Sequence, residues 1–159
     1  EIFFGEDIAE LLQENVVSTL NDTDYALIEF HPTATADYIA QSLYKVENAG
    51  YTPVLAHIER YPDLFKNIKM IEQIIEGGAY IQVNASSVEG RLGGGVKRQI
   101  IKLMKKGLVH FVATDAHSNR SRAPQLEECI RYIEKKLGSD YVKKLFIDNP
   151  EKMVHNEYI

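Results

Sequence analysis

The sequence has a single cysteine, no long apolar run and no concentration of basic residues, and each absence excludes a class of protein. The lone Cys129 cannot form a disulfide within the chain, which fits a reducing compartment. No apolar stretch approaches the ~18 residues that a membrane-spanning helix needs, and no signal peptide is recognisable. A net charge of −5 without a basic stripe argues against nucleic-acid binding. We therefore expect a cytoplasmic protein that neither enters a membrane nor binds nucleic acid, and we leave its oligomeric state open.

Several familiar catalytic motifs are also missing. The glycine-rich segment 90–95 lacks the Gly-Lys-Ser/Thr ending of a P-loop, so we predict a mobile loop at the rim of a site. No serine stands in a nucleophile elbow. Cys129 is followed by Ile-Arg-Tyr and has no arginine at the spacing of a cysteine-based phosphatase loop. Its neighbours at helical spacing are apolar, so we interpret Cys129 as a core residue.

The 159 residues, 45% of them hydrophobic, are enough for one domain with a sizeable core. Strand-like runs alternate with helix-like ones and short connections, which favours a parallel α/β fold. A truncated or distorted (β/α) barrel fits this pattern, and an open doubly wound sheet is the alternative. Residues 1–4 form a strand-like run that starts without methionine, so we expect an N-terminal part to be missing. We predict strands at 25–30, 53–57, 79–83 and 109–114, helices at 36–49, 96–106 and 123–137, another helix ending near Gly77, a loop at 84–95, and two final helices opened by Ser139 and by Asn149-Pro150 as N-caps.

Three of these strands end in residues that bind metals. The run 108–114 ends in Asp115-Ala116-His117, the run 25–28 leads into Glu29, and the run 53–56 leads into His57. The carboxyl ends of parallel strands share one rim, so these side chains can converge despite their separation in sequence. Asp115 and His117 are two apart and would share one side of an extended segment. Carboxylate and imidazole together suit Zn²⁺, Mn²⁺ or Fe²⁺.

Two arginines follow these strand ends. Arg60 comes three residues after His57, and Arg122 comes five residues after His117. Guanidinium groups beside metal ions suit a phosphate, because their fork pairs two of its oxygens. Arg60 could equally form a surface ion pair with a neighbouring carboxylate. From the residues alone, Glu1 is a solvated chain end.

The ordered motifs resemble one family over the whole chain. They are Ile28-Glu29-Phe30, residues 53–61 (PVLAHIERY), residues 82–87 (QVNASS), residues 113–117 (ATDAH) and residues 146–150 (FIDNP). Together they resemble the metal-dependent protein-tyrosine phosphatases of bacterial capsule and exopolysaccharide operons, members of the polymerase-and-histidinol-phosphatase (PHP) superfamily. The resemblance implies a distorted barrel of the PHP type in one domain, residues 1–159, with up to three divalent metals at its rim, of which manganese is the expected one.

The resemblance also implies roles for individual residues. Glu1 and Glu29 would be carboxylate ligands, Glu1 a bridging one, and His57, Asp115 and His117 would complete the ligands in this stretch. Arg60 and Arg122 would bind phosphate while a metal-bound hydroxide attacks phosphorus in line. The implied substrate is the phosphotyrosine tail of a membrane-associated tyrosine kinase that regulates polysaccharide export.

The family's opening His-x-His strand is absent from this sequence, which keeps two other readings open. One is a phosphatase of small esters, similar to the histidinol-phosphate phosphatases. The other is a module that binds its partner without catalysis. Metal content separates a phosphatase from a binding module, and a comparison of phosphotyrosine peptide with small esters separates the two enzymes.

Overall fold

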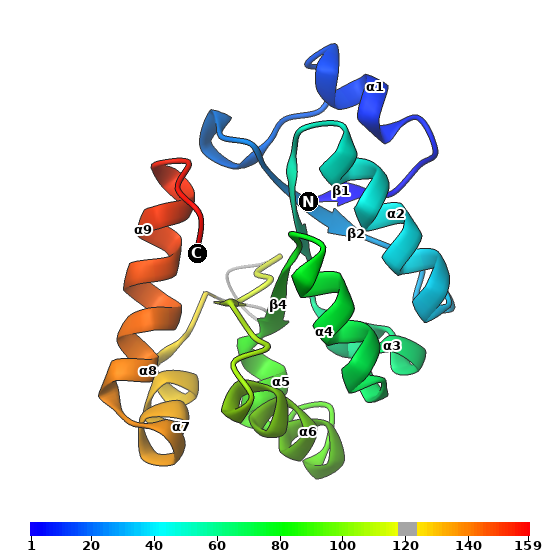
Figure 1. The fold of residues 1–159 in the computed structure, drawn as a ribbon. Coiled ribbons are helices and arrows are strands. Elements are labelled where there is room, and N and C mark those ends of the chain that lie inside the picture. The colour runs from blue at the N-terminus through cyan, green and yellow to red at the C-terminus, as the bar shows by residue number, and fades with distance from the viewer. Residues whose placement is uncertain (118–123) are drawn as a thin grey trace.

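The computed structural model describes residues 1–117 and 124–159, and among these residues five parallel strands form one sheet (Figure 1). The strands follow one another in chain order across the sheet. This order and the short crossovers between strands confirm the predicted parallel α/β arrangement. The strands are β1 (Ile2–Phe3), β2 (Tyr25–Glu29), β3 (Thr52–Leu55), β4 (Tyr80–Asn84) and β5 (Phe111–Ala113).

Helices fill the connections and the C-terminal part of the chain. Among the described residues they are α1 (Ile8–Gln13), α2 (Ala36–Asn48), α3 (Pro62–Lys66), α4 (Ile68–Glu76), α5 (Ala85–Glu89), α6 (Gly94–Lys105), α7 (Glu127–Leu137), α8 (Ser139–Lys143) and α9 (Asn149–Val154), with the 3-10 turns η1 (Leu20–Asp22) and η2 (Ile58–Arg60) and the π-helical turn η3 (Lys144–Asp148). None of the helices in this part of the chain is long and apolar enough to cross a membrane.

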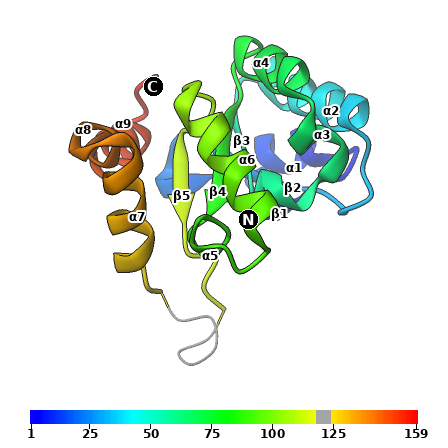
Figure 2. The same cartoon turned by 90° about the horizontal axis from the view of Figure 1, so that it is seen from below.

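Alternate residues of β2 to β5 face two different apolar layers. On β2, Ala26 and Ile28 belong to the main core, whereas Tyr25 and Leu27 face a second, smaller cluster. Seen from below, α2, α3, α4 and α6 lie to one side of the strands, and α7 to α9 gather beyond β5 (Figure 2). The main core is formed by the sheet and the helices of the crossovers, including the fully buried Ile39, Leu55, Ile71, Ile81, Ile100 and Leu103.

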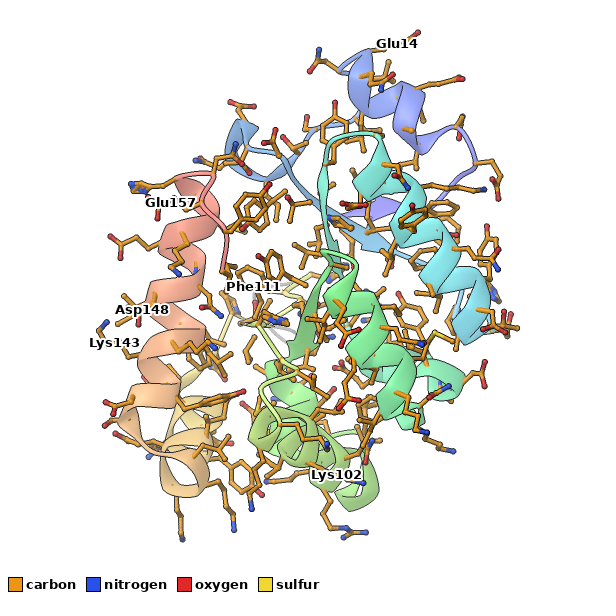
Figure 3. The ribbon with its side chains drawn as sticks, viewed as in Figure 1. Glu14, Lys102, Phe111, Lys143, Asp148 and Glu157 are labelled. Atoms are coloured by element: carbon orange, nitrogen blue, oxygen red, sulfur yellow. The ribbon has the colours of Figure 1, made fainter. Side chains whose placement is uncertain are left out.

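The opposite face of the sheet is covered by the C-terminal segment. Phe111 and Tyr80 pack there against Met153 and Ile159, and Figure 3 shows Phe111 between the sheet and α9. The Ile159 amide donates to Tyr80 Oη at 2.9 Å. Lys143 and Asp148, which form an ion pair, lie on the side of this segment that faces away from the sheet (Figure 3). Residues far apart in sequence therefore cover this face of the sheet near the first residues of β2, β4 and β5.

The predicted strands and most of the predicted helices are confirmed to within a few residues, but the predicted loop and both predicted N-caps are wrong. Ser139 is not an N-cap but the first residue of α8, whose N-cap is Gly138. The expected loop at 84–95 contains α5, because Ala85–Glu89 turn into a helix directly after β4. Asn149 is not an N-cap: its backbone is already helical (φ −67°, ψ −46°), and its buried side chain donates to the His110 carbonyl at 2.7 Å. Among the described residues, β1 and β5 do not pair with each other, so the sheet is open there.

Candidate metal centre and phosphate site

Three of the predicted ligands meet above the first three strands. Ligand atoms of Glu1, Glu29 and His57 all lie within 4.8 Å of one another. His57 Nε2 contacts Glu1 Oε1 and lies 3.4 Å from Glu29 Oε2. Two carboxylates and one imidazole at this separation match the donor set and spacing of a divalent transition-metal site. The residues present therefore fit the expected metal.

The register of β1 explains how Glu1 reaches this group from the start of a strand. Ile2 pairs with Ile28 and Phe3 pairs with Glu29. Glu1 is two residues before Phe3 and therefore projects from the same face of the sheet as Glu29. From its terminal position alone Glu1 was expected to be a solvated chain end; it is exposed, and the register brings its carboxylate beside Glu29 and His57.

His57 is held in one orientation by its backbone and by both sides of its ring. The residue is 2% exposed and has a left-handed backbone (φ 35°, ψ 58°), which is strained for a side chain other than glycine. Its amide donates to Gln82 Oε1, and its Nδ1 lies 3.4 Å from Tyr61 Oη. The Tyr61 hydroxyl also accepts from the Phe30 amide at 3.0 Å, and burial raises the pKa of Tyr61 to about 12. These contacts leave Nε2 directed at the two glutamates.

Asp115 organises a second group at the end of β5. Its Oδ2 accepts from Arg60 Nη2 and from Asn84 Nδ2, the latter at 3.1 Å. Its Oδ1 lies 3.2 Å from His117 Nδ1, which also lies 2.9 Å from the Asp115 carbonyl oxygen. The backbone of Asp115 is left-handed (φ 50°), so the prediction of an extended segment is wrong. A turn brings the two side chains together instead.

Arg60 connects the two groups. Its Nη2 pairs with Asp115, and its Nη1 lies 3.3 Å from His57 Nε2. The same guanidinium therefore faces both the imidazole of the first group and the carboxylate of the second. A phosphate oxygen placed here would meet a fixed cation beside the candidate metal ligands.

A buried polar network beneath the site was not assigned any role from the sequence. Gln82 Nε2 donates to Asn84 Oδ1 at 3.0 Å, and the Asn84 backbone amide donates to Glu59 Oε1 at 2.8 Å. Burial raises the pKa of Glu59, while its hydrogen bonds, among them that from Asn84, act in the opposite direction. The sequence does contain an indication of this network. Gln82 interrupts the apolar run of the predicted strand 79–83, and a buried side-chain amide needs hydrogen-bond partners.

A cleft of about 250 Å³ opens beside Asp115. Arg60 and Asn84 line one part of it, and α5 and the loop that follows α5 line another. Of the seven predicted site residues, the structure places Glu1, Glu29 and His57 in one group and Arg60, Asp115 and His117 in the adjoining one. Arg122 lies outside the described residues.

Comparison with known proteins assigns the family. The family model for capsular polysaccharide synthesis proteins CpsB/CapC matches residues 1–155. The chain belongs to the CpsB/CapC family. The match covers all six of the site residues that the structure describes.

Curated members of the CpsB/CapC family are similar to this chain along its length. The tyrosine-protein phosphatase CpsB of Streptococcus pneumoniae is 37% identical over 164 residues, which cover 100% of this chain and 68% of that protein. The tyrosine-protein phosphatase YwqE of Bacillus subtilis is 33% identical over 156 residues, which cover 98% of this chain and 61% of that protein. The chain thus spans about two thirds of the length of these CpsB/CapC relatives.

A solved structure of the same family has the same fold. A chain from the crystal structures of YwqE from Bacillus subtilis and CpsB from Streptococcus pneumoniae, unique metal-dependent tyrosine phosphatases, superposes with a TM-score of 0.90. It is 33% identical, and the match covers 100% of this chain and 64% of that one. The recognised family and its parallel α/β architecture are therefore confirmed.

Proposed function

We propose that this protein is a metal-dependent phosphatase that removes phosphate from phosphotyrosine. The observation that supports the proposal is the contact of the Arg60 guanidinium with both His57 and Asp115, so that its charge lies between the Glu1–Glu29–His57 group and Asp115. The metal-dependent tyrosine phosphatases among the relatives support the same chemistry.

In this proposal the metal centre is held by Glu1, Glu29, His57, Asp115 and His117. The mixed carboxylate and imidazole set suits Mn²⁺, Fe²⁺ or Zn²⁺. From the family resemblance we propose Mn²⁺, with up to three ions in the complete domain. A bound divalent metal supplies a Lewis acid that stabilises charge on the phosphoryl group and lowers the pKa of water. The buried network beneath His57 keeps its Nε2 on the ligand side.

Arg60, together with Arg122, is proposed to bind the phosphoryl oxygens. Asp115 fixes the Arg60 guanidinium through Nη2, so that the fork is oriented before the substrate arrives. A fixed cation stabilises the charge on the equatorial oxygens during in-line displacement. Orientation by Asp115 and charge from Arg60 are therefore separate contributions to the same step.

The proposed substrate is the phosphotyrosine tail of a membrane-associated tyrosine kinase, which would link this activity to capsule and exopolysaccharide synthesis. The family to which the chain belongs acts in capsular polysaccharide synthesis, which supports this process. Because a kinase tail is phosphorylated with ATP, we propose a cytoplasmic location. We also propose that residues 1–159 belong to one domain of the distorted β/α barrel type.

The test uses the protein at its natural length and measures metal content by elemental analysis and hydrolysis of a phosphotyrosine peptide. We expect divalent metal, turnover that a chelator abolishes, and recovery on addition of Mn²⁺. Glu29→Gln removes one carboxylate charge from the site and should lower both metal content and turnover. Glu14→Gln, on the exposed end of α1, is the matched control and should change neither. Turnover that resists chelation would overturn the proposal.

A further inference from the structure

The connection between α5 and α6 forms a fixed turn at the edge of the cleft. Gly90 (φ 104°) and Gly93 (φ 93°) adopt left-handed backbones that other residues rarely tolerate. The Gly93 amide donates to the Gly90 carbonyl at 2.8 Å, and the Arg91 amide donates to the Ser86 carbonyl of α5 at 3.0 Å. The segment predicted to be a mobile rim loop is therefore tied to α5 by hydrogen bonds. Its two glycines hold Leu92 at the tip of the turn.

Leu92 is a large apolar side chain with little cover. It is 55% exposed, yet it lines the same cleft as Arg60 and Asp115. Among the described residues that line this cleft, Leu92 is the one large apolar side chain, because the others are polar, charged or alanine. Cavities that bind small organic groups combine an apolar wall with a few polar anchors. Here Leu92 is the wall, and Arg60 and Asn84 belong to the polar part.

We propose that Leu92 is a specificity-determining residue that packs against the phenyl ring of phosphotyrosine. This inference rests on the proposed function and deepens it. A phosphoryl group beside Arg60 would leave its ester group in the rest of this cleft, whose lining includes Leu92. An aryl ester offers a wide apolar ring to Leu92, whereas phosphoserine offers a single methylene. Leu92 thus favours aryl over alkyl phosphates without touching the reacting atoms.

The cleft also leaves room for the peptide that carries the phosphotyrosine. A second cavity of about 400 Å³ shares Glu89, Arg91 and Gln125 with the first one and extends to the start of α7. The Arg91 side chain is mostly exposed and pairs loosely with Glu89, at 3.6 Å between Nε and Oε2. The shared wall makes the two cavities neighbours, so the peptide on one side of the phosphotyrosine ring can continue into the second cavity.

The experiment compares Leu92→Ala with the wild-type protein at its natural length and with metal bound. It measures kcat/KM for a phosphotyrosine peptide and for the phosphoserine peptide of the same sequence. We expect kcat/KM for phosphotyrosine to fall about tenfold, as is usual for the loss of an apolar contact in a pocket. The inhibition constant of phenylphosphonate should rise similarly, whereas that of inorganic phosphate should not change. Leu92→Met should restore most of the activity.

Ile147→Ala is the matched control, because Ile147 is 56% exposed on η3 and does not line the cleft. Equal losses for both peptides, or a parallel rise in the inhibition constants of phosphate and phenylphosphonate, would overturn the role of Leu92. An unchanged preference of Leu92→Ala for the phosphotyrosine peptide over the phosphoserine peptide would also overturn it. Absence of metal-dependent turnover in the wild-type protein would instead refute the proposed function, which keeps the two failures distinct.

Discussion

The Arg60 guanidinium pairs with the Asp115 carboxylate across 55 residues of sequence and joins the end of β3 to the end of β5. The carboxylate is the more buried partner, with 8% of its side chain exposed against 37% for the guanidinium. The pair therefore fixes the end of the arginine while leaving part of its fork accessible to a ligand. This arrangement suits a residue that must be oriented and also reach a phosphate.

We predict that Arg60→Ala lowers kcat/KM for a phosphotyrosine peptide about 100-fold, the usual effect of losing one preorganised cationic or hydrogen-bonding group. Arg60→Lys should recover only part of the activity, since an ammonium keeps the charge but lacks the fork that reaches Asp115 and His57 together. Steady-state kinetics on metal-loaded protein provides the measurement. Full activity in Arg60→Lys would show that only the charge matters.

Gln82→Met should weaken metal binding although Gln82 is not a ligand. The substitution leaves the His57 amide and Asn84 Oδ1 without their partner in a buried position. We expect the free energy of unfolding to fall by about 2 kcal/mol and the metal affinity to fall about 10- to 100-fold. Denaturant unfolding and metal titration measure the two effects.

Gln99→Met is the matched control for this prediction. Gln99 donates one hydrogen bond to the Phe65 carbonyl, at 3.0 Å, away from the ligands. Its loss should destabilise the fold slightly and leave the metal affinity unchanged. If both variants bind metal equally well, Gln82 has only a structural role.

His110 should make the protein less stable in acid. Burial, with a smaller contribution from Lys144, lowers the pKa of His110 from about 6.5 to about 4, and its Nδ1 accepts from the Ile81 amide at 3.1 Å. The unfolded chain binds a proton in this range and the folded chain does not. The free energy of unfolding therefore falls as the pH drops from about 6.5 to about 4, by up to roughly 3 kcal/mol from this group.

The variant His110→Asn tests this origin of the pH dependence. The asparagine Oδ1 can accept from the Ile81 amide in place of Nδ1 but does not titrate. We expect a flatter pH profile of the free energy of unfolding between pH 4 and 6.5, measured by denaturant titration. An unchanged slope would show that other groups cause the loss of stability.

The sequence allowed the sheet and most of the site to be predicted because both depend on local patterns. Runs such as 53–57 are apolar and end in a ligand type, and parallel strands bring such ends to one rim. The helix α5 was missed because Asn84 and two serines are typical of a loop. The role of Gln82 was missed because one of its partners, the His57 backbone amide, comes from a segment 25 residues away. The turn at Asp115 was missed because neither composition nor spacing encodes a positive φ outside glycine.

The left-handed backbone of His57 has a consequence for directed evolution. Conformations of this kind cost about 1–3 kcal/mol in residues other than glycine. A screen that rewards heat resistance alone would therefore favour glycine at position 57, which relaxes the chain and removes the imidazole. Libraries selected for thermostability in this protein should hold position 57 constant, or couple the screen to metal retention, because this strained position also carries a proposed metal ligand.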